Sequence, residues 1–183
     1  MKIKLDDIPE GGMEVNANSG NAPWLSSLFI ETLGPDKIKD DDGGRVNLQL
    51  FKNDRNVTVI GGIILKFHPI CDKCLITFQR QQQIPIHQIM APLHAGKKAD
   101  TDMEEDEDFG FYADNEIDLG SIIREQIILS QQMVNKCKDD CSGLCPKCGK
   151  NLNNGPCKCK KKESSDSPFA VLKRQVKTKK NHA

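Results

Sequence analysis

The sequence predicts an α+β protein that combines an antiparallel sheet, packed helices and a small C-terminal zinc-knuckle lobe. The sheet could be closed into a barrel-like arrangement. Apolar and polar residues alternate over much of the first 90 residues, as they do in half-buried strands. Two segments carry apolar residues at three- and four-residue steps, which is typical of helices. Six of the eight cysteines fall within residues 137–159, a density that indicates a bound metal.

The N-terminal segment supplies a short strand and a helix. Ile3 and Leu5 alternate with lysines, which suits a first strand. Residues 16–21 are rich in Asn, Ser and Gly and are expected to form a loop. A helix is predicted over 23–33 because it begins with proline and is followed by Gly34-Pro35, a stop signal.

The central segment predicts a hairpin. Residues 45–52 alternate cleanly, the polar stretch 53–56 suits a turn, and the alternation resumes from 57 to 67. Gly61-Gly62 interrupts the second strand and suggests a bulge or kink. Residues 75–90 are expected to form a further strand pair or one long bent strand.

An acidic stretch and a helix complete the predicted core domain, residues 1–135. Seven of the nine residues from 100 to 108 are acidic, a composition that favours a disordered loop at about 96–114. A helix is predicted at 118–131 with Asp118 as its N-cap. The cysteine-rich lobe, 136–160, and a basic tail with a short helix, 161–183, follow.

Charge is distributed unevenly, although the formal net charge is zero. Residues 136–183 hold 13 of the 26 Lys and Arg but only four acidic residues, a balance of +9, which leaves −9 for residues 1–135. The chain shows neither an apolar secretory segment nor a run of about 18 apolar residues, so we expect a cytoplasmic protein with no membrane partner. The cysteines are therefore interpreted as metal ligands and not as a disulfide framework.

The C-terminal cysteines contain a knuckle, Cys145-Pro146-Lys147-Cys148-Gly149, in which two thiolates can bind one ion while the glycine lets the chain turn. Zn²⁺ is the expected cofactor, and iron–sulfur ligation is the rival, although the spacing matches no standard ferredoxin run. The preferred ligands are two pairs joined by a turn-forming segment: Cys145, Cys148, Cys157 and Cys159. The alternates are Cys137, Cys141, Cys71 and Cys74.

The pair Cys71 and Cys74 admits three interpretations. They could complete a zinc site with Cys145 and Cys148, form a redox pair, or be half-buried thiols at a strand turn. A thioredoxin-type redox pair needs a helix N-terminus to lower the thiol pKa, and the sequence after Cys74 indicates a strand.

Several segments in this order resemble the YceD family, the large ribosomal RNA subunit accumulation proteins. They are CDKCL at 71–75, IDLGSIIREQIILSQQM at 117–133, CSGLCPKCGKNLNNGPCKC at 141–159 and DSPFAVLKRQ at 166–175. The resemblance covers about half of the chain. It implies a bacterial factor, with relatives in chloroplasts, that is needed for synthesis, processing or stability of 23S ribosomal RNA, and it brings no catalytic activity and no small-molecule substrate.

The implied partner is precursor 23S ribosomal RNA or an early large-subunit assembly particle, with ribosomal proteins as further partners. Basic side chains could neutralise phosphates without reading sequence; the candidates are Lys158, Lys160, Lys161, Lys162, Lys173, Arg174 and Lys177. A solubilising tail is the alternative role for them. The alternative function is a protein–protein adaptor that recruits a ribosomal protein or an RNA-processing enzyme, and a thiol–disulfide protein is the third.

Overall fold

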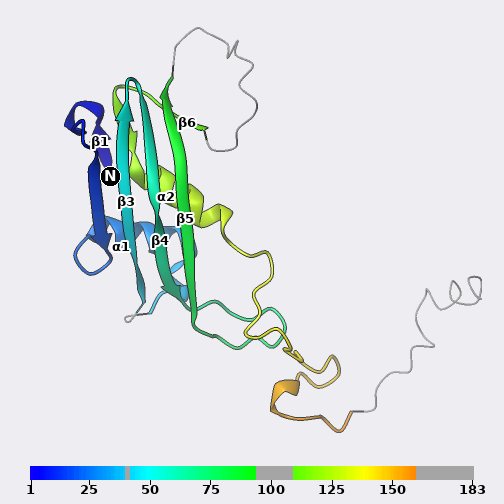
Figure 1. The fold of residues 1–183 in the computed structure, drawn as a ribbon. Helices are drawn as coiled ribbons and strands as arrows, with labels where there is room; N and C mark the ends of the chain where they lie inside the picture. Colours follow the sequence, from blue (N-terminus) through cyan, green and yellow to red (C-terminus); the bar gives the residue numbers. More distant parts are fainter. Residues whose placement is uncertain (40–41, 94–108, 160–183) are drawn as a thin grey trace, which may run out of the picture.

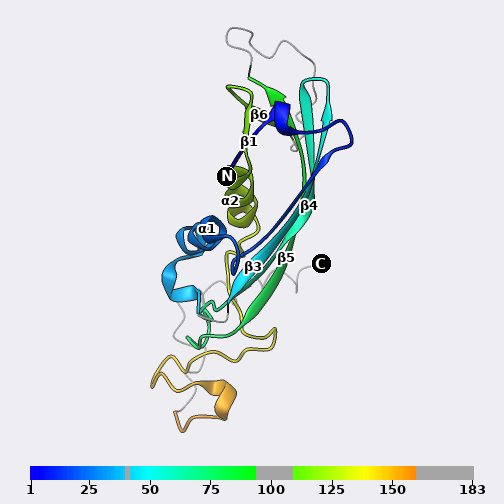
Figure 2. The same ribbon diagram turned by 90° about the vertical axis from the view of Figure 1, so that its left-hand side faces the viewer.

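A computed structural model describes residues 1–39, 42–93 and 109–159. Two helices cover one face of a five-stranded sheet, and a separate lobe, made of residues 68–79 and 133–159, extends beyond one end of the sheet (Figures 1 and 2). The strands are β1 (Lys2–Lys4), β2 (Met13–Asn18), β3 (Gly43–Asn53), β4 (Asn56–Phe67), β5 (Arg80–Pro92), β6 (Phe109–Tyr112) and β7 (Glu116–Asp118). The helices are α1 (Pro23–Leu33) and α2 (Leu119–Leu129), with short 3-10 turns at Leu5–Asp7, Pro35–Lys37 and η3 (Leu152–Asn154).

The α+β class is confirmed, whereas the barrel-like closure is wrong. The sheet has the order β2-β3-β4-β5-β6, and its edge strands β2 and β6 are not paired with each other. Helices α1 and α2 fill the face around which a barrel would have to close (Figure 2). Strands β2 to β5 are antiparallel as expected, but β6 pairs with β5 in parallel.

The β3–β4 hairpin follows the predicted alternation. Val46, Leu48 and Leu50 are buried against the helices, while their neighbours along β3 face solvent. Of the bulge or kink expected at Gly61-Gly62, the bulge is absent, because the register runs without interruption through Leu48↔Gly61 and Asn47↔Gly62. Gly61 instead permits a close approach: a Cβ there would lie 2.1 Å from the carbonyl oxygen of Asn47, at a φ of 148°.

Helix α2 begins where the sequence predicts and ends earlier. The Asp118 carboxylate accepts hydrogen bonds from the backbone N–H groups of Gly120 and Ser121, at 2.9 and 3.4 Å, which makes it the N-cap. The helix ends at Leu129, where the Ser130 hydroxyl donates to the carbonyl of Ile127 at 2.8 Å. Met133, four residues beyond the last residue of the helix, is fully exposed at 100%.

Two other segments differ from expectation. Residues 16–21 are not all loop, because β2 continues to Asn18 as an edge strand whose outer face can carry polar side chains. Residues 75–79 are not strand: β5 begins only at Arg80, and Ile76 is 44% exposed in the loop that joins β4 to β5. This loop, 68–79, belongs to the lobe.

The expected acidic loop at 96–114 also needs correction at its end. Phe109–Tyr112 form β6, and Tyr112 is buried with its hydroxyl donating to the carbonyl of Arg55 at 2.6 Å. The free energy gained by burying the aromatic side chain of Tyr112 outweighs the tendency of this acidic segment to remain disordered. The remainder of the expected loop, 96–108, and the tail for which a short helix is predicted lie outside the described residues, as do most of the basic candidates.

The main core lies between the sheet and the two helices. Leu25 and Phe29 of α1 and Ile123 and Ile127 of α2 are almost completely buried against β3, β4 and β5. The buried cysteines form a second, separate cluster in the lobe. Neither helix in the described parts of the chain has the length and apolar character that crossing a membrane requires.

Candidate metal centres

The lobe, defined here as residues 68–79 and 133–159, contains two knuckles with the same backbone hydrogen bonds. In the first, Cys71 N donates to Ile76 O at 2.8 Å, and Leu75 N donates to Cys71 O at 2.8 Å. In the second, Cys145 N donates to Lys150 O at 2.8 Å, and Gly149 N donates to Cys145 O at 2.9 Å. The chain therefore builds one local structure twice, 74 residues apart.

Each knuckle needs a left-handed residue immediately after its second cysteine. Gly149 has φ 71° and adopts this conformation at little cost, whereas Leu75 adopts it at φ 58° despite its side chain. The leucine hid the first knuckle from sequence analysis, which placed Cys71 and Cys74 at the start of a strand. The shared two-residue spacing between cysteines was the signal that could have revealed it.

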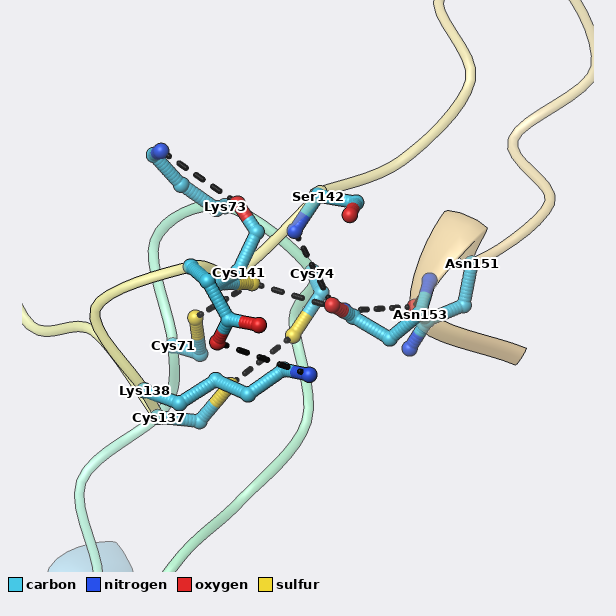
Figure 3. Close-up of polar contacts among 10 residues, drawn as sticks. Cys71, Lys73, Cys74, Cys137, Lys138, Cys141, Ser142, Asn151 and Asn153 are labelled. Atoms are coloured by element: carbon cyan, nitrogen blue, oxygen red, sulfur yellow. Dashed lines mark hydrogen bonds and ion pairs between the residues drawn. The ribbon is translucent and has the colours of Figure 1, made fainter. Parts of the chain in front are cut away.

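The first quartet consists of Cys71, Cys74, Cys137 and Cys141. Its four sulfurs lie within 4.8 Å of one another, with 3.8 Å between Cys71 Sγ and Cys141 Sγ and 3.6 Å between Cys74 Sγ and Cys137 Sγ (Figure 3). Four sulfurs in a tetrahedron about Zn²⁺, at Zn–S distances of about 2.3 Å, would be about 3.8 Å apart. The first quartet could therefore hold a metal ion.

The second quartet consists of Cys145, Cys148, Cys157 and Cys159, the set that sequence analysis preferred. Its sulfurs also lie within 4.8 Å of one another, and Cys157 Sγ lies 3.4 Å from Cys145 Sγ. It too could hold a metal ion. The four alternates are gathered in the first quartet, so the structure does not combine Cys71 and Cys74 with Cys145 and Cys148.

The two quartets differ in exposure. In the first, Cys71, Cys74 and Cys141 are buried, with exposed fractions of 0%, 3% and 4%, and Phe78 and Leu144 pack against them. In the second, only Cys145 is buried, and Cys148 is exposed. A negative charge on the sulfurs of the first quartet is therefore further from water than one in the second quartet, and its stabilisation depends more on hydrogen bonds from the protein.

Thiol pKa values within each quartet move in opposite directions. Burial would raise the pKa of Cys71, but backbone N–H groups of Cys137, Cys74 and Lys73 lower it to about 6. Burial and then the neighbouring cysteine sulfurs raise the pKa of Cys137 to about 12. One thiolate is favoured and suppresses ionisation of another, which is the situation that a bound cation relieves.

The second quartet repeats this division. Backbone N–H groups of Cys148 and Lys147 lower the pKa of Cys145 to about 6, and Lys147 N lies 3.5 Å from its sulfur. The Cys148 sulfur raises the pKa of Cys159 to about 12. Amides that converge on sulfur in this way stabilise metal-bound thiolates.

A short segment joins the quartets. Ser142 to Leu144 lies between a cysteine of the first quartet and one of the second, and Leu144 N donates to the carbonyl of Lys73, inside the first knuckle, at 3.0 Å. Gly143 approaches the same carbonyl so closely, at φ 71°, that a Cβ would lie 3.0 Å from it. Its own carbonyl accepts from Leu152 N at 2.9 Å. The first knuckle and the η3 turn that follows the second knuckle are thus hydrogen-bonded through this segment.

The side chain of Asn153, in the η3 turn after the second knuckle, reaches the first quartet (Figure 3). Its amide Nδ2 lies 3.4 Å from Cys141 Sγ, and its Oδ1 accepts from Ser142 N at 2.9 Å. Hydrogen bonding by this side chain is the largest cause of the lowered pKa of Cys141. Sequence analysis treated residues 151–156 only as a turn and missed this contact.

The basic candidates lie mostly beyond the described residues. Lys158 is exposed on the lobe, whereas Lys160, Lys161, Lys162, Lys173, Arg174 and Lys177 fall within 160–183. The described lobe carries five further exposed lysines, which are Lys73, Lys136, Lys138, Lys147 and Lys150.

Comparison with known proteins places these features in a family context. The family described as "Large ribosomal RNA subunit accumulation protein YceD" matches residues 63–174, which is more than half of the chain and includes both quartets. No solved structure matches the chain.

The chain is also similar to individual curated proteins. An uncharacterized protein of Mycobacterium tuberculosis is 29% identical over 126 residues, 68% of this chain and 59% of that protein, and one of Mycobacterium leprae is 26% identical over 125 residues, 67% and 56%. A protein of Arabidopsis thaliana named "Large ribosomal RNA subunit accumulation protein YCED homolog 1, chloroplastic" is 35% identical over 66 residues, 35% of this chain and 21% of that protein. The chain thus spans little more than half the length of the mycobacterial relatives.

Proposed function

Because this chain belongs to the YceD family of large ribosomal RNA subunit accumulation proteins, we propose that it is a non-catalytic factor that binds precursor 23S ribosomal RNA or an early large-subunit particle. It would act in the cytoplasm and promote the synthesis, processing or stability of that RNA. The observation that carries the proposal is the match of the family to residues 63–174, the part that contains the whole lobe.

Zinc is the metal that we propose for both quartets. Four thiolates at tetrahedral spacing suit Zn²⁺, and closed tetrathiolate sites of this kind are structural. When bound, the metal would supply folding free energy to a lobe in which cysteines form the buried cluster. The protein's residues supply the sulfurs and the N–H groups that disperse their charge.

Charge indicates which residues would contact phosphates. The lobe has six lysines and three acidic residues, a balance of +3, and two tetrathiolate zinc sites would change it to about −1. Residues 160–183 have eight basic and two acidic residues, a balance of +6. The metal-loaded lobe is therefore close to neutral, and the proposal assigns phosphate binding to Lys158 and the basic residues that follow it, with the lobe as their support.

The test is binding of a precursor 23S ribosomal RNA transcript to the full chain over a range of salt concentrations. Replacing Lys160, Lys161 and Lys162 by alanine should weaken binding and reduce the slope of log affinity against log salt by about 2 to 3. The matched control removes three exposed basic residues from the core domain, Lys4, Lys39 and Arg55. Equal losses in the two triple variants, or none in the first, would contradict a specific role for the tail.

A second candidate, the protein–protein adaptor, is favoured by apolar side chains exposed on or next to the lobe. Leu75 is 64% exposed, Leu129 71% and Met133 100%. A ribosomal protein or an RNA-processing enzyme could contact them. Salt separates the two functions, because an apolar interface would respond little to salt concentrations that release a phosphate-bound RNA.

A further inference from the structure

A side chain from the loop that closes the second quartet, Asn153, contacts a sulfur of the first quartet, Cys141 Sγ. We propose that the two quartets bind metal cooperatively and that Asn153 is the positioning residue that couples them. The inference rests on the proposed zinc binding and goes beyond it, because two filled sites could equally well be independent.

The position of Asn153 depends on closure of the second quartet. Asn153 belongs to η3, in the segment that must return from Cys148 for Cys157 to meet Cys145. Its backbone N–H donates to the Asn151 side chain at 3.0 Å, and the neighbouring Leu152 N is held by Gly143 O. A metal in the second quartet joins both ends of this loop and thereby limits where the Asn153 amide can lie.

The first quartet depends on that amide in turn. Four thiolates around a dication carry a net charge of −2, and in this quartet three of the four cysteines are buried. N–H groups directed at sulfur stabilise such a charge. Asn153 Nδ2 is directed at Cys141 Sγ, at 3.4 Å. Because Ser142 N is a donor, it requires Oδ1 on its side of the amide. Nδ2 then donates to Asn151 Oδ1 at 2.8 Å and, with its second hydrogen, can reach Cys141 Sγ.

The backbone provides a second, shorter connection. Only three residues separate Cys141 from Cys145, and the last of them, Leu144, donates to Lys73 O between the first two cysteines of the first quartet. Placing Cys145 in a metal site therefore restricts Cys141. Linkage makes the effect reciprocal, so each metal raises the affinity for the other by the same factor.

The experiment is a zinc titration of the metal-free full chain, followed by native mass spectrometry and competition with a chelator of known affinity. For the native sequence we expect the one-zinc species to be scarcer than independent sites would give. Asn153→Ala should let that species accumulate, with its zinc in the second quartet, and lower first-quartet affinity roughly 10- to 100-fold.

Two further variants separate coupling from folding. Asn153→Asp keeps the acceptor for Ser142 N but removes the donor to sulfur and adds negative charge, so it should lower first-quartet affinity at least as much as alanine does. Asn154→Ala changes the exposed neighbouring side chain and should leave zinc binding as it is. Cys157→Ser/Cys159→Ser removes the second site and should weaken the first.

The outcomes distinguish this inference from the function on which it rests. Two zinc ions bound with a statistical distribution of species, unchanged by Asn153→Ala and Asn153→Asp, would overturn the coupling and leave the zinc proposal standing. If neither quartet bound zinc, both the coupling and the zinc proposal would be overturned. A first-quartet affinity that falls in both Asn153 variants when the second quartet is intact, but falls neither in Asn154→Ala nor further when Asn153→Ala is added to Cys157→Ser/Cys159→Ser, would establish Asn153 as the coupling residue.

Discussion

Arg80 Nη1 donates a hydrogen bond to Asn135 Oδ1 at 2.8 Å, which attaches the first residue of β5 to the segment that follows α2. Its Nη2 reaches Lys136 O at 3.4 Å, and its guanidinium lies 5.2 Å from the centre of the Phe78 ring. Asp72 N donates to Asn135 O at 2.9 Å, and Asn135 N donates to the side-chain carboxylate of Asp72 at 2.6 Å. The two chain segments that make up the lobe are thus joined at the end of the sheet where β5 begins.

Removing this attachment should loosen the lobe without unfolding the sheet. Arg80→Ala should lower the local stability around Asn135 by about 1.5 to 3 kcal/mol, the usual range for hydrogen bonds to a charged group. Hydrogen exchange of the amides in 133–141 measures it. The control is Arg124→Ala, which removes an exposed ion pair to Glu31 and should change stability by less than about 1 kcal/mol. Equal protection in the two variants would contradict a role for Arg80.

Metal removal should unfold the lobe and spare the core domain. The buried cysteines form a cluster of their own, whereas the main core is composed of apolar residues from α1, α2 and the sheet. We expect a zinc chelator to abolish amide protection in 68–79 and 133–159 while protection in β3 to β5 persists. Simultaneous loss in both regions would show that the lobe and the sheet fold as one unit.

The N-cap of α2 should give a pH-dependent stability. Burial raises the pKa of Asp118, but the Met1 ammonium group, 3.5 Å away, and the N–H groups of Ser121 and Gly120 outweigh burial and lower it. Because the folded-state pKa lies below the unfolded one, of about 3.9, the stabilisation is complete above that value and is lost as the pH falls through the folded-state pKa.

Asp118→Ala should therefore cost about 1 kcal/mol at pH 7 and progressively less below about pH 4. Urea unfolding, followed by the helical circular dichroism signal, measures both values. Asp118→Asn keeps an N-cap without a carboxylate, so its smaller cost should also diminish in acid. A deficit for Asp118→Ala that is the same at pH 3 and pH 7 would rule out the carboxylate as the cause.

The two knuckles allow a reciprocal test of backbone strain. Gly149→Leu should lower the zinc affinity of the second quartet by about 1 kcal/mol, because it places a side chain at φ 71°. Leu75→Gly should raise the zinc affinity of the first quartet by less than about 1 kcal/mol, because relief of backbone strain at φ 58° is partly offset by the greater conformational freedom of the unfolded chain. Chelator competition measures both, and an affinity gain from Gly149→Leu would refute the strain argument.

Local patterns predicted the elements whose structure is decided locally. Proline at the start of α1 and Gly34 after it marked the helix bounds, and the alternation of Val46, Leu48 and Leu50 identified β3. Asp118 identified the start of α2. Each of these depends on interactions within a few residues, which a sequence displays directly.

Local patterns could not predict which four of the eight cysteines form each quartet. Cys74 and Cys137 are 63 residues apart, and they meet because the β4–β5 connection lies beside the exit from α2. Sheet closure and the parallel pairing of β6 also depend on where distant segments pack, not on local periodicity. The first quartet was therefore visible only as a set of alternates, although every member was named.

The lobe is joined to the sheet and helices at two places, through both ends of the β4–β5 connection and through the segment that follows α2 (Figure 1). A domain joined to its neighbour at one place can rotate in every direction about that place, whereas a domain joined at two places can rotate only about the line between them. Zinc in the first quartet would link the two points and thereby stiffen this hinge. A molecule bound by the lobe would then be held at a defined orientation relative to the sheet, and the lobe would act as a rigid support.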